Sequence, residues 1–253
     1  MRKGDERKAA LLKASKELFF TRGYAATSIN DILDTQHISK GSFYHHFESK
    51  LEVLTELCRQ HQAEAAERYR AVVKADMPPL RRLDLLLYHA LPAIPEETQM
   101  CALLLQLHRT PEGDQVISAM LDAQRTAFFG LFSGLLRALA KQDEAYLPFE
   151  ALPELAWDMY TSLYRHVLSL GLDYATDRHP APPMYADEAQ LLGAMRYLLE
   201  RTLDLPFGSL TIIRAETLRA VLLEAADIAK AAHQAAGAAP DGDQISLFSA
   251  GRD

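Results

Sequence analysis

Apolar side chains recur at helical spacing along almost the whole chain, and this regularity restricts the fold more than any other feature. Leu11, Ala14 and Leu18 are three and four residues apart, so they lie on one face of an α-helix. No stretch shows the convincing alternation of apolar and polar residues that a half-buried strand requires. Prolines fall mostly between the periodic segments or at their starts, where a helix tolerates them. The pattern therefore predicts an all-α protein.

Capping residues divide the N-terminal part into three short helices followed by one long helix. The first is expected to end at Gly23, in a left-handed conformation that lets Tyr24 fold back on Phe19. The next three starts are expected at Thr27 or Ser28, at Ser39, and at Ser49, where Glu52 completes an S-x-x-E capping box. The third helix is predicted to end near residue 47 and the long one near residue 75. Further helices are predicted near 80–92, 97–109, 112–141, 150–175, 187–204 and 214–236.

Charge is distributed unevenly along the chain, although the whole has a formal net charge of -7 at pH 7. Residues 1–60 hold ten Lys and Arg against eight Asp and Glu, together with three His. The remainder holds seventeen basic and twenty-six acidic residues, so the acidity lies in the C-terminal part. A mildly basic N-terminal part can bind nucleic acid even though the whole protein is acidic.

Composition argues against several other classes of protein. A hydrophobic content of 49% with 24% charged residues is typical of a soluble globular protein. Cys58 and Cys101 lie far apart without a CxxC or His-Cys spacing, so we expect no disulfide framework, metal site or cofactor, and a reducing cytosol as the compartment. The polar N-terminus does not resemble a signal peptide. The most apolar segment, 126–140, is shorter than the ~20 apolar residues that span a bilayer, so no membrane partner is expected.

The stretch SKGSFYHHFESK, residues 39–50, has the features of a helix that reads DNA. Phe43 and Phe47 are four residues apart and can turn together to the interior. The other side is polar, rich in hydrogen-bond donors and aromatic, and it begins at a helix N-terminus, which favours anions. Gly41 lets the backbone approach another surface closely. These features favour a recognition helix in the major groove, while a surface helix with incidental aromatic residues remains the alternative.

The segment from residue 11 to 54 resembles the DNA-binding domain of the TetR/AcrR family of bacterial regulators. The resemblance is carried by elements in the family's order and spacing: Ala14, Leu18-Phe19, Gly23-Tyr24, Thr27-Ser28, Asp31-Ile32, Ser39-Lys40-Gly41, Tyr44, His46-Phe47 and Ser49-Lys50. It covers about a fifth of the chain; the rest matches the family only in helical character and size. One departure is the turn Gln36-His37-Ile38, because the family usually has Ala-Gly before the hydrophobic residue that precedes Ser39.

The resemblance implies a helix-turn-helix DNA-binding domain and a C-terminal helical body that binds a small effector and forms a homodimer. It also implies a palindromic double-stranded DNA operator, base contacts from four residues and phosphate contacts from several others. Carried onto this sequence, the DNA-binding residues are Thr27, Ser28, Ser39, Lys40, Gly41, Ser42, Tyr44, His45, His46 and Lys50. The base contacts are expected from Lys40, Gly41, Ser42 and Tyr44. We expect three regions: the DNA-binding domain in 1–48, the body in 49–237 and a flexible tail in 238–253.

Two helices of the body have two apolar stripes each, which predicts burial on two sides. One side is expected to meet a partner subunit; two central helices of a monomeric core are the alternative. The predicted dimer interface comprises Leu155, Met159, Leu163, Val167, Leu191, Met195 and Leu198. Aromatic and polar residues within greasy segments predict a pocket for a largely apolar or aromatic effector, although plain core packing explains them as well. The predicted pocket residues are Tyr88, Met100, His108, Phe128, Phe132, Trp157, Tyr160 and Tyr164.

Two further readings of the sequence compete with a ligand-responsive repressor in the cytoplasm. The tail peptide QISLF, residues 244–248, is similar to the Gln-x-x-Leu-Phe peptides that dock on the bacterial sliding clamp. This similarity suggests an alternative function, that of a nucleoid- or replication-associated DNA-binding protein. Chance, or packing of the peptide on the protein's own surface, also explains the match. Catalysis is not expected, because Glu96-Glu97 and the loop with Asp173, Asp177 and His179 lack a nucleophile–base pairing or a strong metal spacing.

Overall fold

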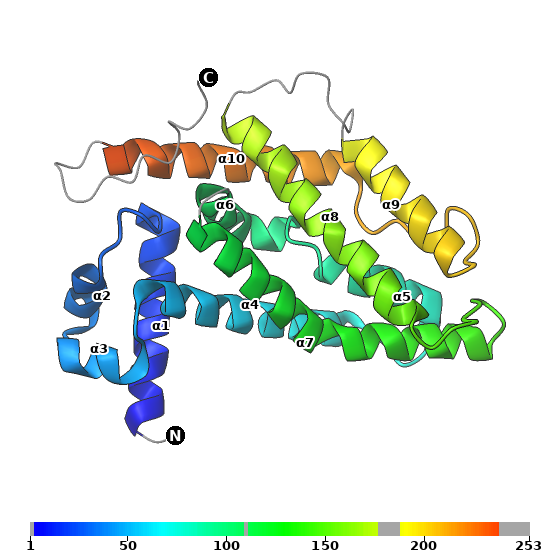
Figure 1. Cartoon of the computed structure of the whole chain (residues 1–253), viewed down its shortest axis with the longest axis horizontal. Coiled ribbons are helices and arrows are strands. Elements are labelled where there is room, and N and C mark those ends of the chain that lie inside the picture. Colours follow the sequence, from blue (N-terminus) through cyan, green and yellow to red (C-terminus); the bar gives the residue numbers. More distant parts are fainter. Residues whose placement is uncertain (1–2, 109–110, 177–187, 238–253) are drawn as a thin grey trace.

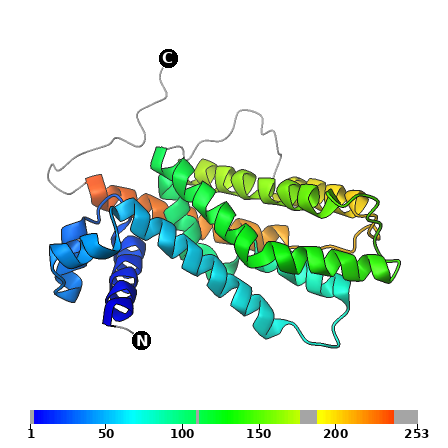
Figure 2. The ribbon, with the colours of Figure 1, turned by 60° about the horizontal axis from the view of Figure 1, so that its bottom comes forward.

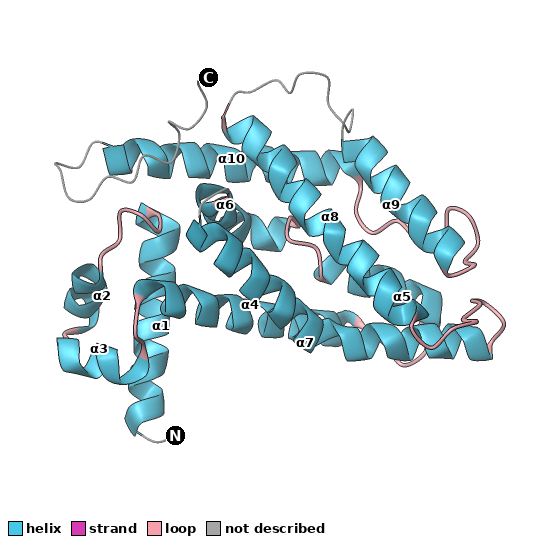
Figure 3. Cartoon of the chain, in the orientation of Figure 1, coloured by secondary structure: helices cyan, strands magenta, loops and turns pink. Residues whose placement is uncertain are grey.

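A computed structural model describes residues 3–108, 111–176 and 188–237, and these ranges fold into helices without a strand (Figure 1, Figure 3). The helices are α1 (Lys3–Arg22), α2 (Ile29–Gln36), α3 (Lys40–His46), α4 (Lys50–Val72), α5 (Pro79–His89), the 3-10 turn η1 (Pro95–Glu97), α6 (Thr98–Leu107), α7 (Pro111–Lys141), α8 (Leu152–Ala175), α9 (Glu188–Thr202) and α10 (Ala215–Gly237). The predicted all-α class is confirmed. No helix in the described ranges is long and apolar enough to cross a membrane.

Helices α1 to α3 form a compact head at one end of the molecule (Figure 1). Gly23 ends α1 with φ of +86°, and its N–H donates to the Phe19 carbonyl at 3.1 Å. The Tyr24 ring then lies 5.3 Å from the Phe19 ring, edge to face, as the sequence predicts. Ser28 caps α2, because its hydroxyl accepts from the Asp31 N–H while the Asp31 carboxylate accepts from the Ser28 N–H.

The turn between α2 and α3 takes a left-handed residue where the family usually has glycine. His37 has φ 51° and ψ 39°, and its N–H donates to the Asp34 carbonyl. The next N–H, from Ile38, donates to the Leu33 carbonyl at 3.0 Å, which closes the end of α2. Histidine therefore supports the turn geometry that sets the direction of α3, at the conformational cost that any side chain has in this region.

Helix α4 runs from the head into the body, where it packs along α7 (Figure 2). Ser49 caps it by accepting from the Glu52 N–H at 3.1 Å, but the Glu52 carboxylate accepts from the Glu48 N–H instead of completing the predicted box. The helix ends at Val72, three residues earlier than expected. The predicted helix 97–109 begins instead with the turn η1, because Pro95 and the two glutamates after it take a 3-10 conformation.

Helix α10 lies lengthwise across the body, against α6, α8 and α9, and its C-terminal end reaches α1 (Figure 1). Gly171 of α8 permits the close approach, because a Cβ there would lie 2.9 Å from a Leu105 methyl group of α6 and 3.2 Å from a Leu222 methyl group of α10. Buried Glu188 joins the three C-terminal helices: it accepts bonds of 3.0 and 2.8 Å from Arg219 of α10 and one from Tyr174 of α8.

The three-region division of the sequence, with boundaries at residues 48 and 237, stays a prediction. The head nevertheless shares one continuous apolar core with the body, since buried Phe43 and Phe47 belong to the same cluster as Leu57 and Phe128. The tail peptide at 244–248 lies outside the described residues.

Candidate DNA interface and effector site

The outward face of α3 holds most of the residues predicted to read DNA. Lys40, Gly41 and His45 are exposed, and the Tyr44 side chain is 49% exposed. Ser42 and His46 are partly exposed beside them. The residues predicted for base contacts therefore lie together on the surface of the head, where a duplex can reach them.

Two buried rings hold this face in position. Phe43 and Phe47 are 0% and 2% exposed, and their ring centroids are 6.0 Å apart. The Tyr44 ring stands edge to face on Phe43 at 5.4 Å, so the buried ring also orients the exposed one. Ser39 caps α3 by accepting from the Ser42 N–H at 3.3 Å, which leaves the Ser39 side chain beside the helix N-terminus. Its predicted contact with DNA stays a prediction, as does that of Ser28, whose hydroxyl serves the α2 cap.

The predicted phosphate contact of Thr27 is wrong for its side chain. Thr27 is fully buried, and its hydroxyl donates to the Gly23 carbonyl at 2.8 Å. The short sequence pattern offered Thr27 and Ser28 equally as the helix cap. The structure assigns the cap to Ser28, and this turns Thr27 inward, where it closes the α1–α2 loop.

The partly buried Lys50 side chain binds carbonyl oxygens of the head, and its predicted contact with a DNA phosphate stays a prediction. Its ammonium group donates to the carbonyl oxygens of Tyr24 and Thr27, at 2.7 Å each, and lies 4.2 Å from the centre of the Tyr24 ring. Burial lowers the pKa of Lys50, although Asp31 and Glu112 oppose the shift. Lys50 therefore fastens the start of α4 to the α1–α2 loop and positions the head relative to the body.

The predicted effector residues mostly lie in the centre of the body. Met100, Phe128, Phe132, Trp157, Tyr160 and Tyr164 are buried, whereas Tyr88 and His108 are partly exposed. The Trp157 ring lies 5.2 Å from Phe132 and 5.7 Å from Tyr160, so α7 and α8 bring these three rings together. Their role as effector ligands stays a prediction, since the same contacts also serve an ordinary core.

Four buried polar atoms of the body lack a hydrogen-bond partner in the described part of the chain, which distinguishes this region from an ordinary core. The Tyr164 hydroxyl, Gln62 Oε1, Gln124 Oε1 and His89 Nδ1 are buried and have no hydrogen-bond partner among the described residues. Burial lowers the pKa of His89 and raises the pKa of Tyr164 well above its usual value, so both side chains are expected to be neutral at pH 7. These four atoms come from α4, α5, α7 and α8.

Gln62 and Gln124 are not among the polar and aromatic residues that the sequence predicted for the pocket. The sequence contains a pattern that could have predicted them, because each glutamine lies at a position of its helix that the apolar periodicity assigns to the core. Gln62 lies four residues from Cys58 and from Ala66, and Gln124 lies four residues from Met120 and from Phe128. A polar residue on a buried stripe predicts either a hydrogen-bond partner or a ligand.

The two acidic clusters that raised the question of catalysis have different outcomes. Glu97 is buried, forms an ion pair with Arg68 of α4 and contacts the His61 ring, which explains its place in the core. The neighbouring Glu96 accepts from the Tyr88 hydroxyl at 3.2 Å. Asp177 and His179 lie outside the described residues. Within the described residues no group of three or more His, Cys, Asp or Glu is arranged to hold a metal ion.

The predicted dimer interface divides into exposed and buried residues. Leu155 is 62% exposed, Leu198 is 45% exposed, and Met159 is partly exposed. By contrast, Leu163, Val167, Leu191 and Met195 are buried within the chain itself, so they have no surface to offer a partner and the prediction is wrong for them. These four residues belong to the inward stripes of α8 and α9, whereas the outward face of α9 also includes Tyr197, which is 51% exposed and was not predicted.

A helical head with an outward polar recognition helix, followed by a larger helical body, defines a helix-turn-helix protein of two-part architecture. Residues 11–57 match the family described as "Bacterial regulatory proteins, tetR family". This match concerns the head: residues 11–57 are similar to the DNA-binding domain of TetR-family regulators, and the related regulators described next are similar over a longer part of the chain.

Two related regulators that match part of this chain are named transcriptional repressors. The HTH-type transcriptional repressor KstR2 of Mycobacterium tuberculosis is 40% identical over 79 residues, which are 31% of this chain and 40% of that protein. The chain thus spans less than half the length of this relative. KstR2 of Rhodococcus jostii is 28% identical over 157 residues, covering 60% of this chain and 76% of the relative.

The fold extends further than the sequence similarity. A TetR-family transcriptional regulator from Pectobacterium atrosepticum has a crystal structure that covers 81% of this chain and 99% of its own, with a TM-score of 0.51 and 21% identity. At this identity the likeness concerns the fold alone. The helical body therefore follows the same architecture.

Proposed function

We propose that the protein is a ligand-responsive transcriptional repressor that acts as a homodimer in the cytoplasm. It binds a palindromic DNA operator and releases it when a small molecule occupies the body. The observation that carries this proposal is the outward face of α3, where Lys40, Gly41 and Tyr44 are exposed while Phe43 anchors the helix. The repressor names of the relatives support the sign of the regulation.

The effector site is proposed in the centre of the body, where four buried polar atoms of α4, α5, α7 and α8 lack hydrogen-bond partners within the described ranges. An unpaired buried polar group costs about 1–3 kcal/mol, so a ligand that supplies the missing partners is favoured. The surface of such a ligand would need to be largely apolar, because the core of the body includes Phe128, Phe132 and Met120. The effector class that fits is an aromatic or alicyclic molecule with a few hydrogen-bonding groups.

The proposed response couples the body to the head through α4. Lys50 ties the first turn of α4 to the head, and the rest of α4 packs on α7 in the body. Two heads must reach major-groove faces about 34–36 Å apart, so a small tilt of α4 in each subunit breaks simultaneous contact. The effector shifts the population only as far as its affinity differs between the two conformations.

Genomic footprinting of the purified protein tests the proposal. We expect a small set of promoters with an inverted repeat, and fragments from these promoters serve as operators. Lys40→Ala and Tyr44→Ala are each expected to reduce discrimination between operator and unrelated DNA by about 1–3 kcal/mol, because a base contact is lost. Lys141→Ala is the matched control, since this exposed lysine ends α7 in the body. Unchanged discrimination in both head variants would contradict the proposed interface.

A further inference from the structure

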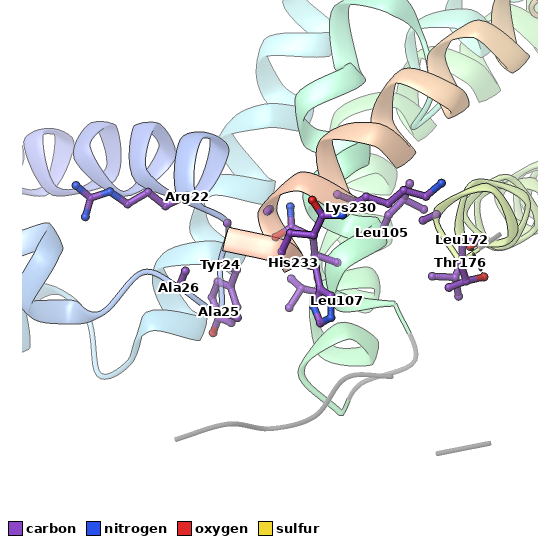
Figure 4. Close-up of a pocket in the computed structure, with 16 residues that line it drawn as sticks. Arg22, Tyr24, Ala25, Ala26, Leu105, Leu107, Leu172, Thr176, Lys230 and His233 are labelled. Atoms are coloured by element: carbon purple, nitrogen blue, oxygen red, sulfur yellow. Dashed lines mark hydrogen bonds between the residues drawn. The ribbon is translucent and has the colours of Figure 1, made fainter. Parts of the chain in front are cut away.

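A cavity of about 410 Å³ lies where the head meets the body, and we call it the junction cavity (Figure 4). Its walls come from four segments: the α1–α2 loop, the end of α6, the end of α8 and the C-terminal half of α10. None of the eight residues predicted for the effector pocket lines it. The junction cavity is therefore distinct from the effector site proposed above.

The free surface of the junction cavity is mainly apolar. Three buried leucines and five alanines from all four segments line it: Leu105, Leu107, Leu172, Ala25, Ala26, Ala175, Ala229 and Ala232. Its charged lining residues have interactions of their own, because Arg22 pairs with Asp31 at 3.7 Å, and Lys230 and His233 are also engaged. The cavity therefore suits apolar side chains better than a charged ligand.

The chain continues beyond the helix that forms one wall of this cavity. Helix α10 lines the cavity from Ala229 to Gln234 and ends at Gly237, three residues further on. Residues 238–253 follow and lie outside the described ranges. Their large apolar residues are Ile245, Leu247 and Phe248. An apolar segment of the same chain is thus attached close to an apolar cavity.

The length of the intervening chain permits this segment to return to the cavity. Seven residues, 238–244, separate Gly237 from Ile245, and eight extended steps span about 25 Å. The part of α10 that lines the cavity begins only eight residues before Gly237, about 12 Å along the helix axis. The sequence Pro240-Asp241-Gly242 lies between and favours a reversal of the chain direction. The tether also keeps the effective concentration of the segment at the cavity on the order of millimolar, so that weak apolar contacts suffice.

We propose that the C-terminal segment of the chain itself occupies the junction cavity, with Leu247 and Phe248 against its leucines and alanines. Burial there removes both side chains from water and gives the apolar lining a partner. The docked segment joins the α1–α2 loop of the head to α6, α8 and α10 of the body. Docking does not depend on the proposed function.

The position of the cavity gives its occupant a direct effect on the head. At Gly23 an added Cβ would lie 2.8 Å from Gln106 Oε1 of α6 and 3.2 Å from Ala232 Cβ of α10, so the head touches both helices beside the cavity. Lys50 holds the start of α4 to the same α1–α2 loop. The docked segment therefore restricts the movement of the head relative to the body. Only the consequence of this restriction for DNA binding rests on the proposed function.

Acrylamide quenching of tryptophan fluorescence in the full chain tests the docking. The single native tryptophan, Trp157, is 1% exposed and gives a constant background. Phe248→Trp places a tryptophan in the docked segment, and Arg252→Trp places one beyond its apolar residues. We expect the quenching constant of the tryptophan at position 248 to be about threefold or more below that at position 252, because docking removes it from solvent.

Two further substitutions in the Phe248→Trp chain show where the tryptophan is shielded. Leu247→Asp puts a charge into the apolar cavity and is expected to raise the quenching constant to the level of Arg252→Trp, whereas Ala239→Asp adds the same charge outside the docked residues and leaves it unchanged. Ala175→Phe fills the cavity from α8 and is expected to raise the constant equally. Its control is Ala220→Phe on the exposed face of α10.

Shielding that Leu247→Asp and Ala175→Phe both remove supports the docking, and Leu247→Asp alone decides if Ala175→Phe fails to fold. Equal quenching at positions 248 and 252, or shielding that persists in either variant, overturns it. Shielding that is lost on dilution would assign the cavity to the C-terminal segment of a second copy and overturn docking within one chain. Failure to select any operator would overturn the proposed function alone, because no DNA takes part in the quenching experiment.

Discussion

At the residue scale, two tyrosines of α8 provide a matched comparison of a satisfied and an unsatisfied hydroxyl. Tyr160 and Tyr164 are both fully buried and four residues apart, but only Tyr160 donates a hydrogen bond, to the Leu87 carbonyl. We expect Tyr160→Phe to lower the free energy of unfolding of the ligand-free protein by about 1 kcal/mol, because a bonded hydroxyl is lost. Tyr164→Phe is expected to leave it unchanged or to raise it. Urea unfolding measures both; equal losses would show that the Tyr164 hydroxyl is bonded in solution.

His37 provides a second test at this scale, in the turn before the recognition helix. Because its φ is 51°, glycine relieves the strain of a side chain in the left-handed region. We expect His37→Gly to raise the free energy of unfolding by up to about 1 kcal/mol and His37→Val to lower it by about 1–2 kcal/mol. Gln36→Gly, one residue earlier within α2, is expected to lower it by about 0.5–1 kcal/mol. A stabilising Gln36→Gly would refute this account of the turn.

At the element scale, Glu188 connects α9 to α8 and α10. Burial alone would raise the pKa of Glu188, but hydrogen bonds from Arg219 and Tyr174 outweigh it and hold the pKa below its usual 4.5. The contribution of Glu188 to stability is therefore complete above pH 4.5 and is lost as the pH falls through the lowered pKa of the folded state.

We expect Glu188→Gln to lower the free energy of unfolding by about 1–3 kcal/mol at pH 7. The difference from the unchanged protein is expected to shrink below pH 4.5, where Glu188 takes up a proton. Denaturant unfolding across a pH series measures this convergence. Glu216→Gln is the control, because Glu216 is exposed on α10 and is expected to have little effect at any pH. A constant difference down to low pH would mean that the charge of Glu188 is not what stabilises the junction.

Much of the helical architecture could be predicted from the sequence, because each helix has its own apolar stripe and its own stop. Gly23 and the three serines before α2, α3 and α4 fix the head in this way. The direction of individual side chains could not be predicted where neighbouring residues have the same chemistry. Threonine and serine are both good helix caps, yet only one of Thr27 and Ser28 can cap α2. Lys50 binds carbonyl groups of residues that lie 23 and 26 positions earlier in the chain, a contact that local spacing does not indicate.

At the scale of the whole molecule, the exposed part of the predicted interface tests the dimer. Leu155 and Leu198 remain accessible on α8 and α9, and we propose that these faces meet those of a second copy. Leu198→Asp is expected to convert a dimer into a monomer in sedimentation velocity, because a charge in the interface loses its hydration. Leu223→Asp is the matched control, since Leu223 of α10 is also 45% exposed. A Leu198→Asp protein that still sediments as a dimer would place the interface elsewhere.

The close approach of Gly23 to Ala232 joins two segments that are synthesised far apart in time. The head, with its helices and caps within residues 3–50, leaves the ribosome before α10 does. A nascent chain, or a chain cut near its C-terminal end, can thus have the recognition helix without the contact between Ala232 and Gly23. Proteolysis near residue 230 would then leave the DNA-binding face of α3 in place and remove the contact between α10 and the head.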